Sequence, residues 1–182
     1  MLSKIHGHTV DESLLTNGVV IDIGCRDFQF ASHFKTKTVY CVDPDKEIFR
    51  NIPPNVIPVN RAVSNYNGES SYYRNGEMTA LTEIYKGWEH ERYNCNVITL
   101  SDLYAMTGRN IDLLKLDCEG SEYYILDETF EPIPKMVSVE FHRHMYPELH
   151  DKMYDKVLDT LLLHYNLVYQ HETLMDNLFV RK

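Results

Sequence analysis

The stretch Val19-Val-Ile-Asp-Ile-Gly-Cys-Arg-Asp-Phe28 decides how the rest of the chain is interpreted. Its first five residues are mostly β-branched and stop at Gly24, which predicts a short buried strand that ends in a tight turn. In open α/β sheets, ligands bind at the carboxyl ends of the strands, and a glycine there lets the backbone pass close to a nucleotide. We therefore expect an α/β fold with a nucleotide site at this turn.

The residues around Gly24 indicate which nucleotide the turn would bind. A dinucleotide-binding loop needs a second glycine two positions later, where this chain has Arg26, so a nicotinamide dehydrogenase is a poor interpretation. The acids Asp22, Asp27 and Asp43 would repel a polyphosphate, but they suit a nucleoside that carries a positive charge. S-adenosylmethionine (SAM), which has a sulfonium and no phosphate, fits that description.

The composition narrows the class of protein. A chain of 182 residues that is 43% hydrophobic predicts one domain with a substantial core. Its 27 acidic and 18 basic residues give a net charge of -9, which argues against a nucleic-acid partner. No secretion signal or membrane-spanning stretch is recognisable, and the four cysteines are scattered without metal-type pairs. We expect a soluble, cytoplasmic protein with no membrane partner; its oligomeric state is not predictable from these features.

Local patterns predict the order of the elements. After Val19–Ile23, strands are predicted at Thr38–Val42, Asn55–Val59, Asn96–Thr99, Ile111–Asp117 and Lys135–Phe141. Helices are expected around Phe30 and Phe34, from the capping box Thr99-Leu-Ser-Asp102 to an end at Gly108, and from Asp151 to Tyr165. Two closing strands, Leu167–His171 and Asn177–Val180, predict an antiparallel edge hairpin on a mostly parallel sheet.

Two segments fall outside this regular pattern. Residues 1–17 are interpreted as a short lead-in. His6 and His8 are candidate metal ligands, but a mobile terminal His-Gly-His is more often solvated, which is what we expect here. Residues 65–94 contain the turn pairs Asn67-Gly68 and Asn75-Gly76, which predict a hairpin insert.

Asp43 is a candidate ligand for the ribose. It follows the second strand nineteen residues after Gly24, close to the spacing at which nucleotide-binding units place an acid on the ribose hydroxyls. Because Pro44 favours a first helical position, Asp43 is also a candidate N-cap, and the two roles are compatible. Arg61 and Ala62, which follow the third strand, are expected to border the adenine.

Lys115 marks the stretch in which chemistry is most expected. It interrupts the apolar strand Ile111–Asp117, and an unpaired buried ammonium is costly. Asp117 shares a face with Lys115 and offers a charge pair. The strand then runs into Cys118-Glu119-Gly120.

With these pieces in place, the chain resembles the FkbM-type family of class I SAM-dependent methyltransferases from Val19 to Val180. The most specific match is the Lys-x-Asp-x-Glu-Gly block, residues 115–120. The other matching pieces are Asp22-Ile-Gly24, Asp43-Pro44, Ala62-Val-Ser64, Asn67-Gly-Glu69, Thr99-Leu-Ser-Asp102, Val139-Glu-Phe-His142 and Asn177-Leu-Phe-Val180. The chain departs from the family at Cys25-Arg26-Asp27, where small residues and a further glycine are typical, and in its short lead-in.

The resemblance implies a doubly wound, Rossmann-like class I methyltransferase sheet, one domain over residues 1–182, and SAM as the cofactor. It also implies methyl transfer to a hydroxyl oxygen of a sugar or small-molecule acceptor. The residues that we assign to cofactor binding are Asp22, Gly24, Cys25, Arg26, Phe28, Asp43, Pro44, Arg61, Ala62 and Asp117.

Holding the acceptor oxygen, methyl and sulfur in line can supply about 7 to 11 kcal/mol of the rate acceleration. The candidates for the base that removes the hydroxyl proton are Asp117, His142, Glu119 and, if burial lowers its pKa, Lys115. Asp117 ranks first because it ends the strand beside the nucleotide strand, and His142 ranks second because an imidazole accepts protons near neutral pH.

Two alternatives remain open. Glu140, His142 and His144 alternate, so on a continuing strand they would share one face and, with Asp117, hold a divalent ion. Their spacing lacks the fuller context of a known metal motif, so this hypothesis is the weaker one. In the second alternative, the chain is a SAM-binding or nucleotide-binding interaction module that has lost catalysis. The altered turn at Cys25-Arg26-Asp27 and the short lead-in favour this alternative.

Overall fold

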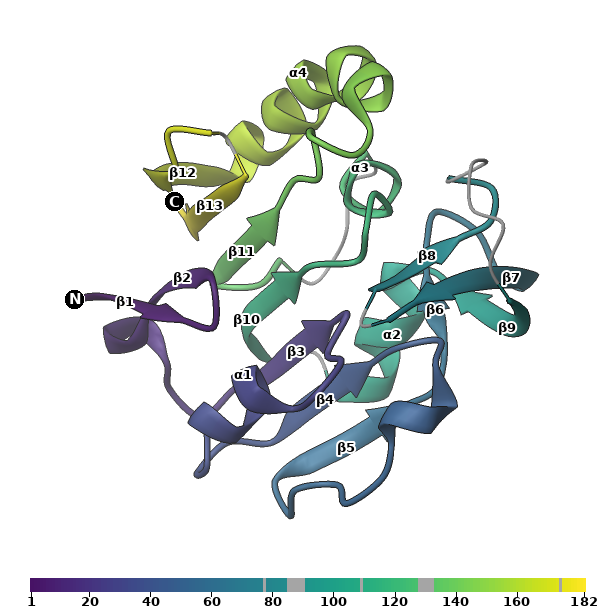
Figure 1. Ribbon diagram of the computed structural model, residues 1–182. Coiled ribbons are helices and arrows are strands. Elements are labelled where there is room, and N and C mark those ends of the chain that lie inside the picture. Colours follow the sequence, from purple (N-terminus) through teal and green to yellow (C-terminus); the bar gives the residue numbers. More distant parts are fainter. Residues whose placement is uncertain (77, 85–90, 109, 128–132, 174) are drawn as a thin grey trace.

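A mixed seven-stranded sheet forms the centre of the molecule (Figure 1). The computed structural model describes residues 1–182 except for residues 77, 85–90, 109, 128–132 and 174. The strands lie in the order β12-β13-β11-β10-β3-β4-β5. Their bounds are Tyr165–Gln170, Asp176–Arg181, Met136–Glu140, Ile111–Leu116, Val19–Ile23, Val39–Val42 and Val56–Val59. The sequence predicted each of them to within two residues, and the α/β class is confirmed.

Most neighbouring strands are parallel. β10 pairs in parallel with both β3 and β11, and β4 pairs in parallel with β3 and β5. β13 runs antiparallel to β11 and β12, which confirms the C-terminal antiparallel hairpin and leaves β12 at the edge. The central position of β3 and β10 brings the Gly24 turn beside the Lys115–Gly120 block.

Both faces of the sheet are buried. On one face, α2 (Leu100–Thr107), α3 (Glu122–Ile125) and α4 (Pro147–His164) pack on side chains of β3, β10 and β11. On the other face, α1 (Gln29–His33) and an N-terminal hairpin pack on the alternate side chains of the same strands. Burial on both sides explains why these strands are nearly continuous apolar runs.

The N-terminal residues are not the solvated lead-in that we expected. β1 (Leu2–Ile5) and β2 (His8–Asp11) form an antiparallel hairpin, and β2 lies against β11 and β13. His6 and Gly7 form its turn with positive φ angles of 45° and 91°. His6 is exposed as expected, but the expectation for His8 was wrong, because its side chain is 1% exposed.

The segment between β5 and α2 forms a second, four-stranded sheet in the order β6-β9-β7-β8. Its strands are β6 (Ala62–Val63), β7 (Gly68–Asn75), β8 (Met78–Leu81) and β9 (Arg92–Ile98). The antiparallel β7–β8 pair confirms a hairpin within residues 65–94. The strand predicted at Asn96–Thr99 belongs to this small sheet.

The helix expected after Pro44 is only a 3-10 turn, Lys46–Ile48. Its N-cap is Asp45, whose side chain accepts a hydrogen bond from the Glu47 amide, so the N-cap role expected for Asp43 was wrong. The Asp43 carboxyl therefore does not cap a helix.

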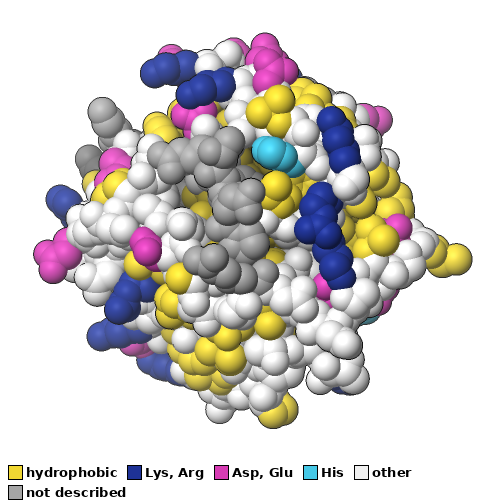
Figure 2. All heavy atoms as spheres, turned by 180° about the vertical axis from the view of Figure 1, so that it is seen from behind, with side chains coloured by type: hydrophobic (Ala, Val, Ile, Leu, Met, Phe, Trp, Pro, Cys, Tyr) yellow, Lys and Arg dark blue, Asp and Glu magenta, His cyan; other side chains and the backbone are white. Residues whose placement is uncertain are grey.

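On the face shown in Figure 2, acidic, basic and apolar side chains are interspersed. The net charge of -9 is therefore not gathered into one patch on this face. None of the described helices combines the length and the apolar character that crossing a bilayer requires.

Candidate functional site

The turn after β3 is shaped by the loop that follows β10. Gly24 has a φ of 78°, and a Cβ atom at this position would lie 1.7 Å from the carbonyl oxygen of Asp117. A glycine is therefore required here by the neighbouring backbone as well as by any ligand. Lys115 Nζ donates a hydrogen bond of 2.8 Å to the Gly24 carbonyl and thereby holds the turn in place.

Lys115 forms a buried ion pair with Asp22 on the adjacent strand. The two residues are in register, and Lys115 Nζ lies 2.9 Å from Asp22 Oδ1 and 3.5 Å from Asp117 Oδ2. The predicted partner Asp117 is present, but Asp22 is closer. Burial works to lower the pKa of Lys115, yet Asp22 and Asp117 outweigh burial and raise it above the ordinary value. The condition under which Lys115 was a candidate base, a pKa lowered by burial, is therefore not met.

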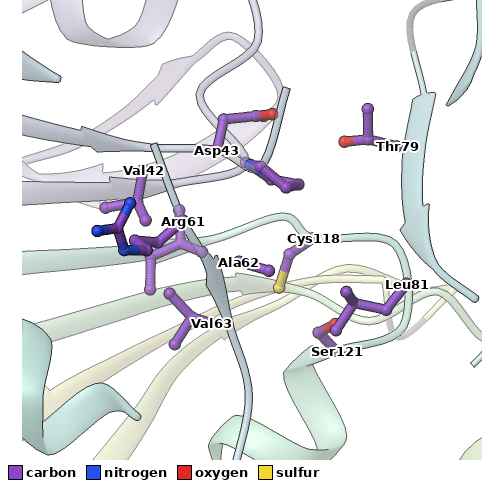
Figure 3. A pocket seen from close by; sticks show the side chains of 12 residues that line it. Val42, Asp43, Arg61, Ala62, Val63, Thr79, Leu81, Cys118 and Ser121 are labelled. Atoms are coloured by element: carbon purple, nitrogen blue, oxygen red, sulfur yellow. The ribbon is translucent and has the colours of Figure 1, made fainter. Parts of the chain in front are cut away.

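Three adjoining hollows lie along the carboxyl ends of β3, β4 and β10. The inner hollow is lined by Ile23, Gly24, Val42, Asp43, Pro44, Arg61, Ala62, Val63, Thr79, Leu81, Cys118 and Ser121. In Figure 3, Asp43 stands on one side of it and Thr79 and Leu81 of β8 on the other, with Cys118 and Ser121 between them. The small sheet therefore contributes one wall.

The other two hollows share residues with the inner one. The turn hollow is lined by His6, Gly24, Cys25, Arg26, Asp27, Gln29, Phe30, Lys115 and Asp117. The outer hollow is lined by Arg26, Asp27, Asp43, Asp45, Glu47, Ile48, Arg74, Gly76 and Thr79. The inner and turn hollows share Gly24, the turn and outer hollows share Arg26, and the inner and outer hollows share Asp43, so the three adjoin one another. Together they are called the groove.

Asp43 is held at the junction of the inner and outer hollows. Its side chain is 2% exposed, and Oδ1 accepts a hydrogen bond of 2.8 Å from the Asp45 amide. The Arg26 amide is a second donor to this carboxyl. Burial raises the pKa of Asp43 to about 7. Both donors are backbone groups, so lone pairs of the carboxylate remain available to a ligand.

Most of the residues assigned to the cofactor lie in this groove. Gly24, Asp43, Pro44, Arg61 and Ala62 line the inner hollow, and Cys25, Arg26 and Asp117 line the turn hollow. Asp22 and Phe28 are not among the described lining residues. Asp22 is fully buried beside Lys115, and Phe28 packs in the core with its ring centroid 6.1 Å from that of Phe49.

Asp117 lies between two histidines. Its Oδ2 is 3.5 Å from His8 Nε2, and its Oδ1 is 3.5 Å from His142 Nε2, which also lies 3.3 Å from Glu119 Oε2. Burial works to raise the pKa of Asp117, but Lys115 and His8 outweigh it and hold the pKa well below the ordinary range. Asp117 is therefore ionised and a weak proton acceptor.

The other two candidate bases differ from Asp117. Burial works to lower the pKa of His142, but the carboxylate of Glu122, with smaller contributions from Glu119 and Asp117, raises it to about 10. Burial raises the pKa of Glu119 to about 7. In the apo protein, the imidazole that we ranked second is thus protonated at neutral pH.

Glu122 organises this part of the site, although the sequence did not single it out. Its carboxylate is fully buried and accepts hydrogen bonds from the Cys118 amide (2.7 Å), the Gly120 amide (2.9 Å) and His142 Nδ1 (3.0 Å). One side chain therefore holds the loop that carries Asp117 and Glu119 and orients His142. The sequence signal that could have identified Glu122 is its position as an acid directly before the apolar run Tyr123–Leu126.

The four residues that alternation would place around an ion do not come together. β11 ends at Glu140, so the strand does not continue to His142 and His144. Glu140 falls into a group with His8 and Asp117, whereas His142 falls into a group with Asp117 and Glu119. His144 is exposed and belongs to neither of these groups.

Ser138 was also missed, and the sequence did not place His8 beside it. His8 Nδ1 lies 3.3 Å from the Ser138 hydroxyl, so the N-terminal hairpin reaches the centre of the polar cluster. A usable signal was present: His6-Gly7 is a two-residue turn flanked by two four-residue strand candidates. That pattern does not indicate, however, that the hairpin would bury the side chain of His8.

Comparisons with known proteins agree with the fold. The chain is similar to the crystal structure of methyltransferase FkbM from Methylobacillus flagellatus KT, with a TM-score of 0.52 and 14% identity over 93% of this chain. It spans 45% of the length of that protein. No protein of curated function matches the sequence. Residues 22–169 match the family described as the methyltransferase FkbM domain, and the chain therefore belongs to this family.

Proposed function

We propose that this chain is a SAM-dependent methyltransferase that transfers a methyl group to a hydroxyl oxygen of a sugar or another small acceptor. Family membership supports methyl transfer, and the mixed sheet with its antiparallel C-terminal hairpin supports a class I, Rossmann-like arrangement. The observation that carries the proposal is the placement of the Asp43 carboxyl where an apolar hollow meets the Gly24 turn.

The residues along the groove fit the parts of SAM. Val42, Ala62, Val63 and Leu81 offer an apolar slot for the adenine, and Asp43 has lone pairs left for the ribose hydroxyls. Gly24 and Asp117 line the turn hollow, where the amino-acid end would lie. When bound, SAM supplies an electrophilic methyl group.

The residues of the chain contribute position and charge. Lys115 and Glu122 fix the two loops that face the groove, so the acceptor would meet a rigid surface. Alignment of the reacting atoms can supply about 7 to 11 kcal/mol. The ionised Asp117 is suited to holding a positive charge beside the groove.

The decisive experiment tests whether the Asp43 carboxyl binds the ribose hydroxyls. Calorimetric titrations would compare S-adenosylhomocysteine with its 2′-deoxy analogue on the wild type and on Asp43→Asn. Hydrogen bonds to a charged group contribute about 1.5 to 3 kcal/mol, so we expect about a 10-fold to 100-fold loss of S-adenosylhomocysteine affinity in Asp43→Asn. The 2′-deoxy analogue keeps only the 3′-hydroxyl, so Asp43→Asn should weaken its binding less than that of S-adenosylhomocysteine.

Other outcomes are equally informative. An equal loss for both ligands would mean that Asp43 acts on the fold and not on the ribose. No binding of either ligand at millimolar concentration would reject the cofactor. If binding is found, product mass spectrometry over a panel of sugars and small alcohols should reveal the addition of one methyl group to oxygen.

A further inference from the structure

We propose that Asp117, Glu119 and His142 form a binding site for one divalent metal ion of the zinc type. The three side chains offer one imidazole nitrogen and two carboxylate oxygens, all within 4.8 Å of one another. An imidazole with two carboxylates is a donor set that suits zinc and its first-row neighbours. The role of the ion in methyl transfer rests on the proposed function, but its binding does not.

The orientation of His142 supports this site. Its Nδ1 faces the Glu122 carboxylate at 3.0 Å, which directs Nε2 toward Asp117 and Glu119. Histidines that bind metals almost always donate their other ring nitrogen to such a carboxylate or carbonyl group. Glu122 also holds the loop between the two acidic ligands through the Cys118 and Gly120 amides.

The spacing of the donor atoms fits an ion better than direct hydrogen bonds. His142 Nε2 lies 3.5 Å from Asp117 Oδ1 and 3.3 Å from Glu119 Oε2, which is long for hydrogen bonds between charged groups. Ligands at about 2.0 to 2.1 Å from a tetrahedral ion lie about 3.3 Å from one another. Glu119 Oε2 is buried and has no hydrogen-bond partner among the described residues.

Three carboxylates surround one imidazole. Those of Asp117, Glu119 and Glu122 all converge on His142, and Asp117 also lies 3.5 Å from both Lys115 Nζ and His8 Nε2. The backbone of Glu119 has a positive φ of 52°, an uncommon conformation for a residue other than glycine and typical of functional sites. The Asp117 side chain is 31% exposed and lines the turn hollow, so a fourth ligand would approach from that side. An acceptor hydroxyl bound there would be acidified by the ion.

The test is metal binding by the tag-free, EDTA-treated full chain. Co²⁺ alone would be titrated and followed by visible absorption, because four-coordinate Co²⁺ absorbs far more strongly than the aqueous ion. We expect one equivalent to bind, with at least tenfold weaker binding in His142→Gln and in Glu119→Gln. Glu122→Gln should weaken binding about 10-fold to 100-fold through the orientation of His142.

His144→Gln is the matched control. This histidine lies two residues from His142 with the ring centroids 6.0 Å apart, but it is exposed and outside the site. Its replacement should leave Co²⁺ binding unchanged. Circular dichroism would establish that each variant is folded, and Glu119→Gln, the more exposed position, serves if His142→Gln does not fold.

Several results would overturn the site. Equal Co²⁺ affinity in His142→Gln and the wild type would do so, as would no binding at millimolar Co²⁺. A thiolate charge-transfer band in the near ultraviolet would assign the ion to a cysteine such as Cys118. Titration of S-adenosylhomocysteine in EDTA tests the proposed function separately, so a failed metal site and a failed cofactor site remain distinguishable.

Discussion

At the scale of single residues, Gly24 allows a strong prediction. Gly24→Ala would place a Cβ atom 1.7 Å from the Asp117 carbonyl oxygen and adds left-handed strain, because the φ is 78°. We expect a loss of at least about 2 kcal/mol in the free energy of unfolding, measured by urea titration. Gly76→Ala is the control: its φ is 59°, but no described residue lies within 4 Å of an added Cβ atom.

The comparison of Gly24→Ala with Gly76→Ala separates the cost of left-handed backbone strain from the cost of the steric clash with the Asp117 carbonyl. Gly76→Ala should cost only about 1 to 2 kcal/mol, the price of a left-handed alanine. Equal losses in the two variants would show that the backbone of the Asp117 loop moves aside freely, contrary to its fixation by Glu122.

Asp112 is the main structural acid at the opposite end of β10. It is fully buried, and its carboxylate lies 2.8 Å from both Lys37 Nζ and Lys135 Nζ while accepting hydrogen bonds from the Thr16 and Gly18 amides. Asp112→Asn leaves two cations without their partner, so we expect a loss of about 2 to 4 kcal/mol. S-adenosylhomocysteine affinity should not change, because the groove is at the other end of the strand.

This acid also makes stability depend on pH. Burial works to raise the pKa of Asp112, but Lys135 and Lys37 lower it from 3.8 to about 2. A lowered folded-state pKa gives stability that is fully present above pH 3.8 and is lost as the pH falls toward 2. The contribution is about 2 kcal/mol. Urea unfolding at pH 7 and pH 3.5 should show that the gap between the wild type and Asp112→Asn narrows at the lower pH; a constant gap would refute this.

At the scale of elements, the β1–β2 hairpin is fixed to the sheet by a few polar contacts. Thr9 Oγ1 donates a hydrogen bond of 2.7 Å to Asp176 Oδ2, and the Thr9 amide donates to Asp176 Oδ1 at 3.3 Å. Thr9→Val removes the shorter bond and leaves a buried carboxylate oxygen without it, at a cost of about 1 to 2 kcal/mol.

Hydrogen exchange should localise this effect. Amides of residues 2–10 should exchange about tenfold faster in Thr9→Val, while those of β3 and β10 keep their protection. Thr160→Val is the control, since the Thr160 hydroxyl bonds only to the Lys156 carbonyl within α4 in the described structure. Uniformly faster exchange in Thr9→Val would mean that the hairpin and the sheet open together.

The elements differ in how well the sequence predicts them. Strands buried on both faces are apolar throughout, so β3, β4, β10 and β11 were predicted almost to the residue. The 3-10 turn at Lys46–Ile48 was predicted as a helix because Asp-Pro signals a start and says nothing of length. The hairpin at residues 2–11 was missed because its burial comes from contacts with β11 and β13, which are distant in sequence.

At the scale of the whole molecule, we predict one cooperative unfolding transition. The small sheet is tied to the main one, because Arg74 of β7 lies 2.8 Å from Asp45 Oδ2 at the end of β4, and the Tyr72 hydroxyl donates to Asp45 Oδ1. Far-ultraviolet circular dichroism reports the whole chain, whereas hydrogen exchange in the same urea series resolves the amides of β7 and β9. The two midpoints in urea should coincide; an earlier midpoint for β7 and β9 would divide the chain into two units.

The sequence predicted individual residues of the candidate site better than it predicted which of them contact one another. Strand-end motifs placed Gly24, Asp43 and Asp117 along one edge, because carboxyl ends of parallel strands meet there. Charge balance inside the site depends on which buried groups touch, and this made Asp22 the closer partner of Lys115 and Glu122 the partner of His142. Such pairings cross between elements, so periodicity within one element does not reveal them.

The way in which the small sheet begins and ends has a practical consequence. β6 and β9 are paired in parallel, Ala62 beside Val97 and Val63 beside Ile98, so the chain leaves and rejoins the main body at neighbouring points. The cost of closing the intervening segment grows only slowly with its length. Segments that are grafted between Val63 and Val97 and keep Tyr72 and Arg74, the partners of Asp45, would therefore vary one wall of the groove while leaving the ends of β3, β4 and β10 in place.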